Sequence, residues 1–162
     1  MLNLKKTVIS TVMISIISMS GVFAFGIGLQ IDGDPYGGGY GPALTFKLDT
    51  VPLVFAANID ITEKDFSFGL TGDWWIFNNT IEKSYPVKWF VGYGFFIHSG
   101  TGRAESLIAG ARLPIGVNAF FNDGFIEPYI QVAPSVGIAF EPSFHFPEWY
   151  LPVSLGIRFW FD

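Results

Sequence analysis

The chain has 162 residues, which is enough for one domain with a sizeable core. It is acidic, with a formal net charge of -5 at pH 7, and this argues against a nucleic-acid partner, which needs a basic surface. The absence of cysteine excludes disulfide bonds and a lipid-anchored lipoprotein start. Only 14% of the residues are charged, whereas an average soluble domain has about 25%. The composition therefore offers little with which to build a surface that faces water.

Residues 1–24 have the composition of a secretory signal peptide. Lys5 and Lys6 precede an apolar run from Thr7 to Ser18, and Val22-Phe23-Ala24 resembles a signal-peptidase site. The apolar run is short for a helix that spans a membrane. We therefore expect export and cleavage after Ala24, which leaves residues 25–162 as a single domain.

The rest of the chain alternates between apolar and other residues, with turn clusters between the alternating segments and no sustained helical spacing. Eight segments are predicted to be strands: Phe25 to Asp32, Ala43 to Asp49, Leu53 to Ile61, Phe66 to Phe77, Val87 to His98, Ser106 to Phe121, Phe125 to Phe140 and Leu151 to Phe161. Asn122-Asp123-Gly124 is a strong hairpin signal. Longer connections are expected at Gly33 to Pro42, Asn78 to Pro86, Ser99 to Glu105 and Glu141 to Tyr150.

The two faces of these predicted strands differ in chemistry. One face is bulky, apolar and uncharged, as in Ile27, Leu29 and Ile31. The other face holds most of the strand glycines and the charged residues Lys47, Asp60, Asp73, Lys88, Arg112, Glu127 and Arg158. An uncharged apolar face suits lipid, and a crowded polar face suits a narrow lumen. Because backbone groups in lipid must all be paired, the sheet must close. We predict an all-β fold, an eight-stranded antiparallel up-and-down transmembrane β-barrel.

The charges on the lumen face nearly balance in sign. Buried charges persist when they are paired, so these residues predict an internal salt-bridge network in a lumen filled by side chains. A proton or ion path is the alternative.

Aromatic residues lie near one end of the predicted lipid-facing surface. They are Phe25, Trp74, Trp89, Phe121, Phe159 and Phe161. If both chain ends are periplasmic, these residues form the periplasmic aromatic girdle. The loops Gly33 to Pro42, Ser99 to Glu105 and Glu141 to Tyr150 are then extracellular.

The residues from 25 to 162 resemble the small eight-stranded outer-membrane proteins of the OmpA, OmpX and OmpW kind. The runs "GARLPIGVNAFF", "FIEPYIQVAPSVGIAF" and "LPVSLGIRFWF" are similar to uncharacterised small barrels of spirochaetes. The last strand resembles the carboxy-terminal sorting signal of such barrels, with Phe161 as its final aromatic residue, although Asp162 follows it. The resemblance implies location in the outer membrane of a diderm bacterium and contact with the barrel-assembly machinery, and it supplies no catalytic residues.

The motifs outside the predicted strands favour surface contacts over chemistry. Tyr36 and Tyr40 lie in a glycine-rich segment without the lysine of a phosphate-binding loop. Asp32 to Gly37 only half-matches a calcium loop. His145, Trp149 and Tyr150 lie in the aromatic segment "SFHFPEWY", where a metal site would need more ligands than His145 and Glu148. These tyrosines and aromatic-segment residues are therefore candidate contacts for lipid headgroups, an extracellular ligand or a host surface. We expect no cofactor and no metal.

Four functions remain possible for such a chain. The favoured one is a non-enzymatic outer-membrane barrel of structural or surface-interaction type. The second is a narrow channel or carrier for small or apolar molecules. The third is a lipid A-modifying enzyme, which would use His98, Ser99 and an acid such as Glu105, although adjacent strand residues point to opposite faces. The fourth is a soluble lipocalin-like barrel, which would have to turn the uncharged face inward.

Overall fold

The computed structural model describes residues 24–33, 40–61, 66–81, 86–101, 106–141 and 143–161 of the chain. The predicted signal peptide therefore lies almost entirely outside the described residues, and it stays a prediction. The described residues form eleven strands. These are β1 (Phe25–Gly33), β2 (Tyr40–Leu48), β3 (Leu53–Ile61), β4 (Phe66–Thr80), β5 (Val87–Thr101), β6 (Ser106–Arg112), β7 (Ile115–Ala119), β8 (Ile126–Val132), β9 (Ser135–Glu141), β10 (His145–Tyr150) and β11 (Val153–Phe161).

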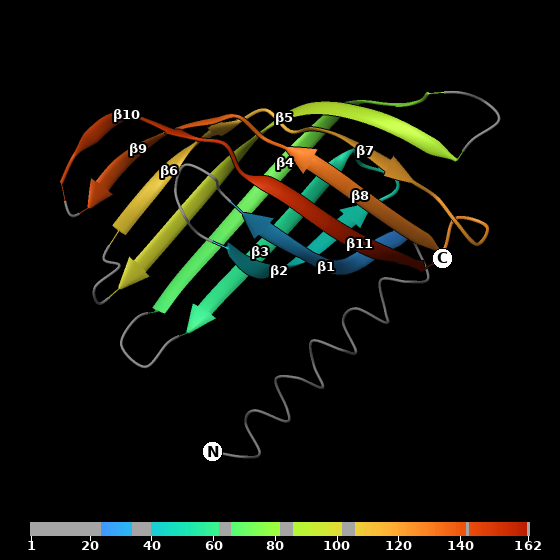
Figure 1. Cartoon of the computed structure of the whole chain (residues 1–162), viewed down its shortest axis with the longest axis horizontal. Helices are drawn as coiled ribbons and strands as arrows, with labels where there is room; N and C mark the ends of the chain where they lie inside the picture. Colours follow the sequence, from blue (N-terminus) through green and yellow to red (C-terminus); the bar gives the residue numbers. More distant parts are fainter. Residues whose placement is uncertain are drawn as a thin grey trace, which may run out of the picture.

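The strands close into an antiparallel barrel of eight (Figure 1). Around the ring, β1, β2, β3, β4 and β5 follow one another, and β7, β8 and β11 lead back to β1. The closing pair is β1 with β11, in register from Phe25 opposite Phe161 to Gly33 opposite Val153. The predicted eight-stranded barrel is therefore confirmed. Among the described residues, no helix is long and apolar enough to cross a membrane.

Three predicted strands are each broken once by proline. Pro114 separates β6 from β7, Pro134 separates β8 from β9, and Pro152 separates β10 from β11. Proline lacks the N–H that continues a strand ladder, so each ladder pauses at these positions. The proline carbonyl oxygens still accept hydrogen bonds from the neighbouring strand, from the N–H groups of Gly92, Leu113 and Ala133 at 2.9 Å. The breaks therefore lie side by side across the wall, and β6, β9 and β10 extend the sheet beyond them (Figure 1).

Several predicted boundaries were wrong. Strand β2 begins at Tyr40, three residues before the predicted Ala43, and β5 continues to Thr101, three residues past the predicted His98, so the predicted loops on either side are shorter. The segment Glu141 to Tyr150, predicted as a loop, contains strand β10, which pairs with β9. The pairing of β10 with β9 shifts register between His145 and Glu148. This shift interrupts the alternation that identifies a strand, and the aromatic and proline residues of the segment suggested a loop instead. Strand β4 also runs three residues past its predicted end at Phe77, to Thr80, because a bulge near Trp75 and Phe77 lets the ladder continue. Asn78 therefore faces the lumen and lines a cavity there.

Polar residues fill the inside of the barrel, and large apolar residues cover its outside. The buried polar side chains are Gln30, Thr45, Lys47, Asp73, Arg112, Asn118, Glu127, Gln131, Ser135, Ser154 and Arg158. Leu29, Ile31, Leu44 and Leu155 on the outside are 60–62% exposed. This is the reverse of a water-soluble domain, in which charged side chains cover the exterior.

Candidate functional site: the charged lumen and its two cavities

Glu127 is the centre of the principal charge cluster in the lumen. Its Oε1 lies 3.3 Å from Lys47 Nζ, and its Oε2 lies 3.0 Å from Arg158 Nε. Asn118 Nδ2 donates to Oε1 at 2.6 Å, and Trp160 Nε1 donates to Oε2 at 2.9 Å. Three hydrogen-bond donors and the Arg158 guanidinium, from three strands, therefore converge on one carboxylate that is 0% exposed.

The Arg158 guanidinium lies between aromatic rings that project into the lumen from different strands. Arg158 lies on β11, which is four positions around the ring from β4, the strand that carries Trp75. The guanidinium carbon is 5.2 Å from the centroid of the Trp75 ring and 4.0 Å from that of Tyr129. The terminal nitrogens of Arg158 have no hydrogen-bond acceptor among the described residues, so these aromatic faces provide their cation–π contacts.

A stacked aromatic pair fills the lumen beside this cluster. The rings of Trp75 and Phe90 have centroids 3.7 Å apart and an interplanar angle of 8°. With Val54 they form the buried apolar cluster of the described residues. Phe90, Glu127 and Arg158 are each 0% exposed, so these charge pairs and rings are packed against one another inside the barrel.

A second ion pair lies apart from the first. Arg112 Nε is 3.1 Å from Asp73 Oδ1, and both side chains are buried. Elsewhere in the lumen, the Tyr129 hydroxyl donates to Gln30 Oε1, and Gln30 Nε2 donates to both carboxylate oxygens of Asp32 at 2.7 and 2.9 Å. The ion pairs of the described residues thus form two separate clusters rather than one continuous network.

One residue of the predicted network, Lys88, lies outside both clusters. The Asp60 side chain falls outside the described residues. Lys88 makes no ion pair among the described residues, and its Nζ instead lies 4.9 Å from the Phe120 ring centroid. The sequence prediction did not include Asn118, Trp160 and Tyr129 in the network. Asn118 and Trp160 donate hydrogen bonds to Glu127, and the Tyr129 ring contacts the Arg158 guanidinium. The sequence could have indicated these three residues, because each lies two positions from a residue of the predicted lumen face on the same strand.

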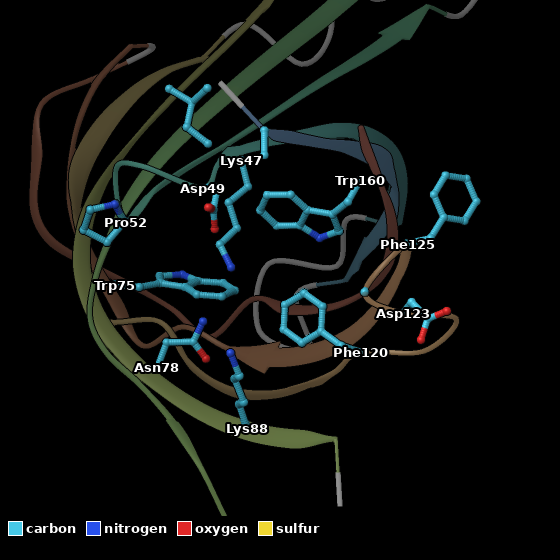
Figure 2. Close-up of a pocket in the computed structure, with 13 residues that line it drawn as sticks. Lys47, Asp49, Pro52, Trp75, Asn78, Lys88, Phe120, Asp123, Phe125 and Trp160 are labelled. Atoms are coloured by element: carbon cyan, nitrogen blue, oxygen red, sulfur yellow. The ribbon is translucent and has the colours of Figure 1, made fainter. Parts of the chain in front are cut away.

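A cavity of about 480 Å³ opens at the end of the barrel that carries Ala24 and Trp160. We call it the lower cavity. Figure 2 shows Lys47 and Lys88 pointing into it, with Trp75, Phe120 and Trp160 around them. The acidic residues Asp49 and Asp123 are exposed at its rim. The cations of the cavity therefore lie inside, and its anions lie at the edge.

A second cavity, of about 270 Å³, lies toward the other end of the lumen. We call it the upper cavity. His98 lines it together with Asp32, Asn58 and Arg112. Ser99 does not line this cavity and follows His98 on strand β5, where successive side chains alternate between faces. Glu105, the acid of the hypothetical enzyme site, lies outside the described residues.

The six predicted girdle residues lie toward the end of the barrel with the lower cavity. Trp74, Trp89, Phe121, Phe159 and Phe161 are exposed on the outside. Phe25 differs, because it is only 6% exposed. Its ring packs against Phe46 and Phe161, with centroids 5.9 and 5.5 Å away. Phe77, which was not predicted, is exposed beside Trp89 at 6.2 Å between ring centroids, since the bulge in β4 turns it outward.

The predicted surface contacts are only partly described. Tyr36 and the Tyr40 side chain lie outside the described residues. His145 Nδ1 is 3.1 Å from both the hydroxyl and the carbonyl oxygen of Ser143, and no group of three metal-ligating side chains occurs among the described residues. Trp149 is strongly exposed, whereas Tyr150 packs edge-on against Phe96 at 5.6 Å.

The hairpin of β9 and β10 presents further exposed aromatic residues. Phe144 and Phe146 are 69% and 64% exposed, and the sequence prediction did not single them out. The many aromatic residues of the segment "SFHFPEWY" could have indicated these two residues. With Trp149 they form an apolar surface at the end of the barrel opposite the carboxy terminus (Figure 1).

Comparisons with known proteins return matches only among solved structures. No family profile matches the chain, and no curated protein matches it. The crystal structure of neisserial surface protein A matches with 12% identity and a TM-score of 0.43, over 86% of this chain and 96% of that one. A major outer membrane protein of Thermus thermophilus matches with 14% identity and a TM-score of 0.37, over 85% and 99%. OmpT of Vibrio cholerae matches with 10% identity and a TM-score of 0.30, over 85% of this chain and 42% of that one.

The chain is a small β-barrel of the outer-membrane type by its own architecture. The ring of strands is closed, the lumen is polar and the exterior is apolar. The likeness to spirochaete barrels stays a prediction.

Proposed function

We propose that this chain is an integral outer-membrane β-barrel with a closed lumen, which anchors surface loops rather than conducting solutes. The apolar exterior supports the membrane location, because covering exposed leucine and isoleucine side chains with lipid removes their apolar surface from water, which lowers the free energy. The first strand pairs with the last along its whole length, so all eight strands of the ring are paired, as a bilayer requires.

The observation that carries the closed lumen is the complete burial of Arg158 and Glu127 inside the barrel. Arg158 reaches the Trp75 ring, which projects from β4, and the Trp75–Phe90 stack fills the space beside it. We call Glu127, Arg158, Trp75 and Phe90 the central layer. The cavities above and below this layer belong to different ends of the barrel. An eight-stranded barrel has room for side chains in its lumen but for little else.

Single-channel recording in planar bilayers tests this proposal. The wild-type protein should give no discrete conductance steps. The double variant Glu127→Ala/Arg158→Ala, which truncates the two buried charged side chains beside the Trp75–Phe90 stack, should give steps if it folds. Frequent steps from the wild-type protein would show that the lumen conducts, and the function of a narrow channel or carrier would then lead.

Refolding tests the membrane location separately. The protein should fold in detergent micelles, show a strand-rich circular dichroism spectrum and migrate faster on a gel before boiling than after it. A protein that folds and stays soluble without detergent would refute the lipid-facing exterior. Heat-dependent migration also serves as the folding check for each variant below.

Two contacts complete the proposed function. Strand β11 presents Leu155, Ile157, Phe159 and Phe161 in phase, as a terminal strand offered to the barrel-assembly machinery would. The aromatic hairpin of β9 and β10, at the opposite end, would contact lipid headgroups or an extracellular partner. Loss of surface labelling at a cysteine placed at Phe146, after removal of the barrel-assembly machinery, would support both assignments, and unchanged labelling would contradict the first.

A further inference from the structure

The lower cavity holds more positive charge than its surroundings neutralise. Lys47 and Arg158 share one carboxylate, that of Glu127, and Lys88 has no ion pair among the described residues. Glu127 also accepts hydrogen bonds from Asn118 and Trp160, so its oxygens are already engaged. The exposed carboxylates of Asp49 and Asp123 lie at the rim, where water screens them.

The cavity also has hydrogen-bond donors without acceptors. The ammonium of Lys47 carries three N–H groups, and one of them is directed to Glu127. Trp75 is only 2% exposed, and its buried indole N–H has no acceptor among the described residues. An acceptor that enters the cavity gains charge attraction and hydrogen bonds from the free N–H groups of Lys47 and Lys88, whereas the buried Trp75 N–H is not accessible from the cavity.

The walls of the same cavity are aromatic. The rings of Phe120 and Trp160 have centroids 6.2 Å apart and face the space around Lys47 and Lys88 (Figure 2). Lys47 Nζ lies 4.3 Å from the Trp75 ring centroid and 5.3 Å from that of Trp160. A flat apolar group can lie against these rings while an attached anionic group meets the ammonium groups.

We propose that the lower cavity binds a small organic carboxylate with a flat or apolar body. Its carboxylate takes hydrogen bonds from the ammonium groups of Lys88 and Lys47, and its body packs against Phe120 and Trp160. The bound anion neutralises the excess positive charge below the central layer. With the chain termini in the periplasm, the cavity opens to the periplasm, and its ligand comes from that compartment; this orientation rests on the proposed function.

NMR of the full-length protein in detergent micelles tests the site with three probes. They are phenylacetate, its neutral analogue phenylacetamide, and inorganic phosphate. The Trp75 indole signal is identified by its loss in Trp75→Phe. We expect phenylacetate to shift this signal saturably and to bind about tenfold more tightly than phenylacetamide, because charge-assisted hydrogen bonds are the stronger ones. Phosphate should bind more weakly than phenylacetate, since it leaves the aromatic walls uncovered.

Variants of Lys88 are the most informative. Lys88 has no ion-pair partner among the described residues, so replacing it leaves no carboxylate unpaired. Lys88→Met should weaken phenylacetate binding about tenfold, whereas Lys88→Arg should stay within about threefold of wild type. Glu141→Gln, which neutralises an exposed carboxylate on β9 that lines neither cavity, is the matched control and should leave binding nearly unchanged. The probe comparison on wild-type protein still decides the question if Lys88→Met fails to fold.

Three results would overturn the proposal. Equal binding of phenylacetate and phenylacetamide would show that charge is not recognised. Equal binding of phosphate and phenylacetate would show that the aromatic walls do not contribute to recognition of the ligand. No saturable shift with any probe would show that the cavity holds only water. None of these outcomes depends on whether the lumen conducts.

Discussion

Replacing Glu127 with glutamine should strongly destabilise the barrel while leaving its shape almost unchanged. The carboxylate faces Arg158 at 3.0 Å and Lys47 at 3.3 Å, and all three side chains are buried. Glutamine keeps the volume but leaves both cations without a counter-charge in the lumen. Removing one partner of a buried ion pair costs about 3–5 kcal/mol. Since one carboxylate serves two cations here, we expect the loss in the free energy of unfolding to lie toward the upper end of that range.

Equilibrium unfolding in guanidinium, followed by tryptophan fluorescence of the micelle-refolded protein, measures this loss. Asp73→Asn is the matched control, because Asp73 pairs with one cation only, Arg112, among the described residues. It should cost less than Glu127→Gln. The double variant Glu127→Gln/Lys47→Met should recover part of the loss, since it removes one of the two stranded cations. A Glu127→Gln variant within about 1 kcal/mol of wild type, or a double variant no more stable than the single one, would refute the reasoning.

Three smaller predictions concern packing, turn geometry and lipid contact. Gly116→Ala should destabilise by about 1–3 kcal/mol, because its Cβ would overlap the Ile130 carbonyl oxygen, whereas Gly41→Ala, with no atom within 4 Å, should be nearly neutral in the same unfolding assay. Gly124→Ala should cost about 1 kcal/mol at its φ of 94° and slow refolding measured by gel migration, and an unchanged stability would show that the turn tolerates a side chain. Leu155→Lys should cost about 2–4 kcal/mol in lipid vesicles, and a neutral result would place that face in water.

Alternation along the chain predicted which face of each strand points inward. The buried polar residues Gln30, Thr45 and Gln131 all belong to the predicted lumen face, and the exposed Leu29 and Leu44 belong to the predicted lipid face. This works because the side-chain period of a strand is two residues whatever the strand pairs with. The Asn122-Asp123-Gly124 turn is equally local, and all three residues have positive φ angles.

The strand boundaries were harder to predict because partners determine them. Pro114, Pro134 and Pro152 lie far apart in the sequence, and only the pairing of their strands brings the three breaks together across the wall. Strand β10 depends in the same way on β9, since its irregular register hides the alternation that identifies a strand.

The sequence by itself determined the class of the protein: a closed barrel with an apolar exterior and a charged interior. Only the tertiary structure decided which charges meet. Lys47 and Glu127 are 80 residues apart, and the stagger of eight tilted strands places them 3.3 Å from each other. The same stagger leaves Lys88 without a carboxylate among the described residues and collects the unpaired positive charge in one cavity. A local pattern fixes the direction of a side chain, but contacts across a lumen depend on how the whole ring closes.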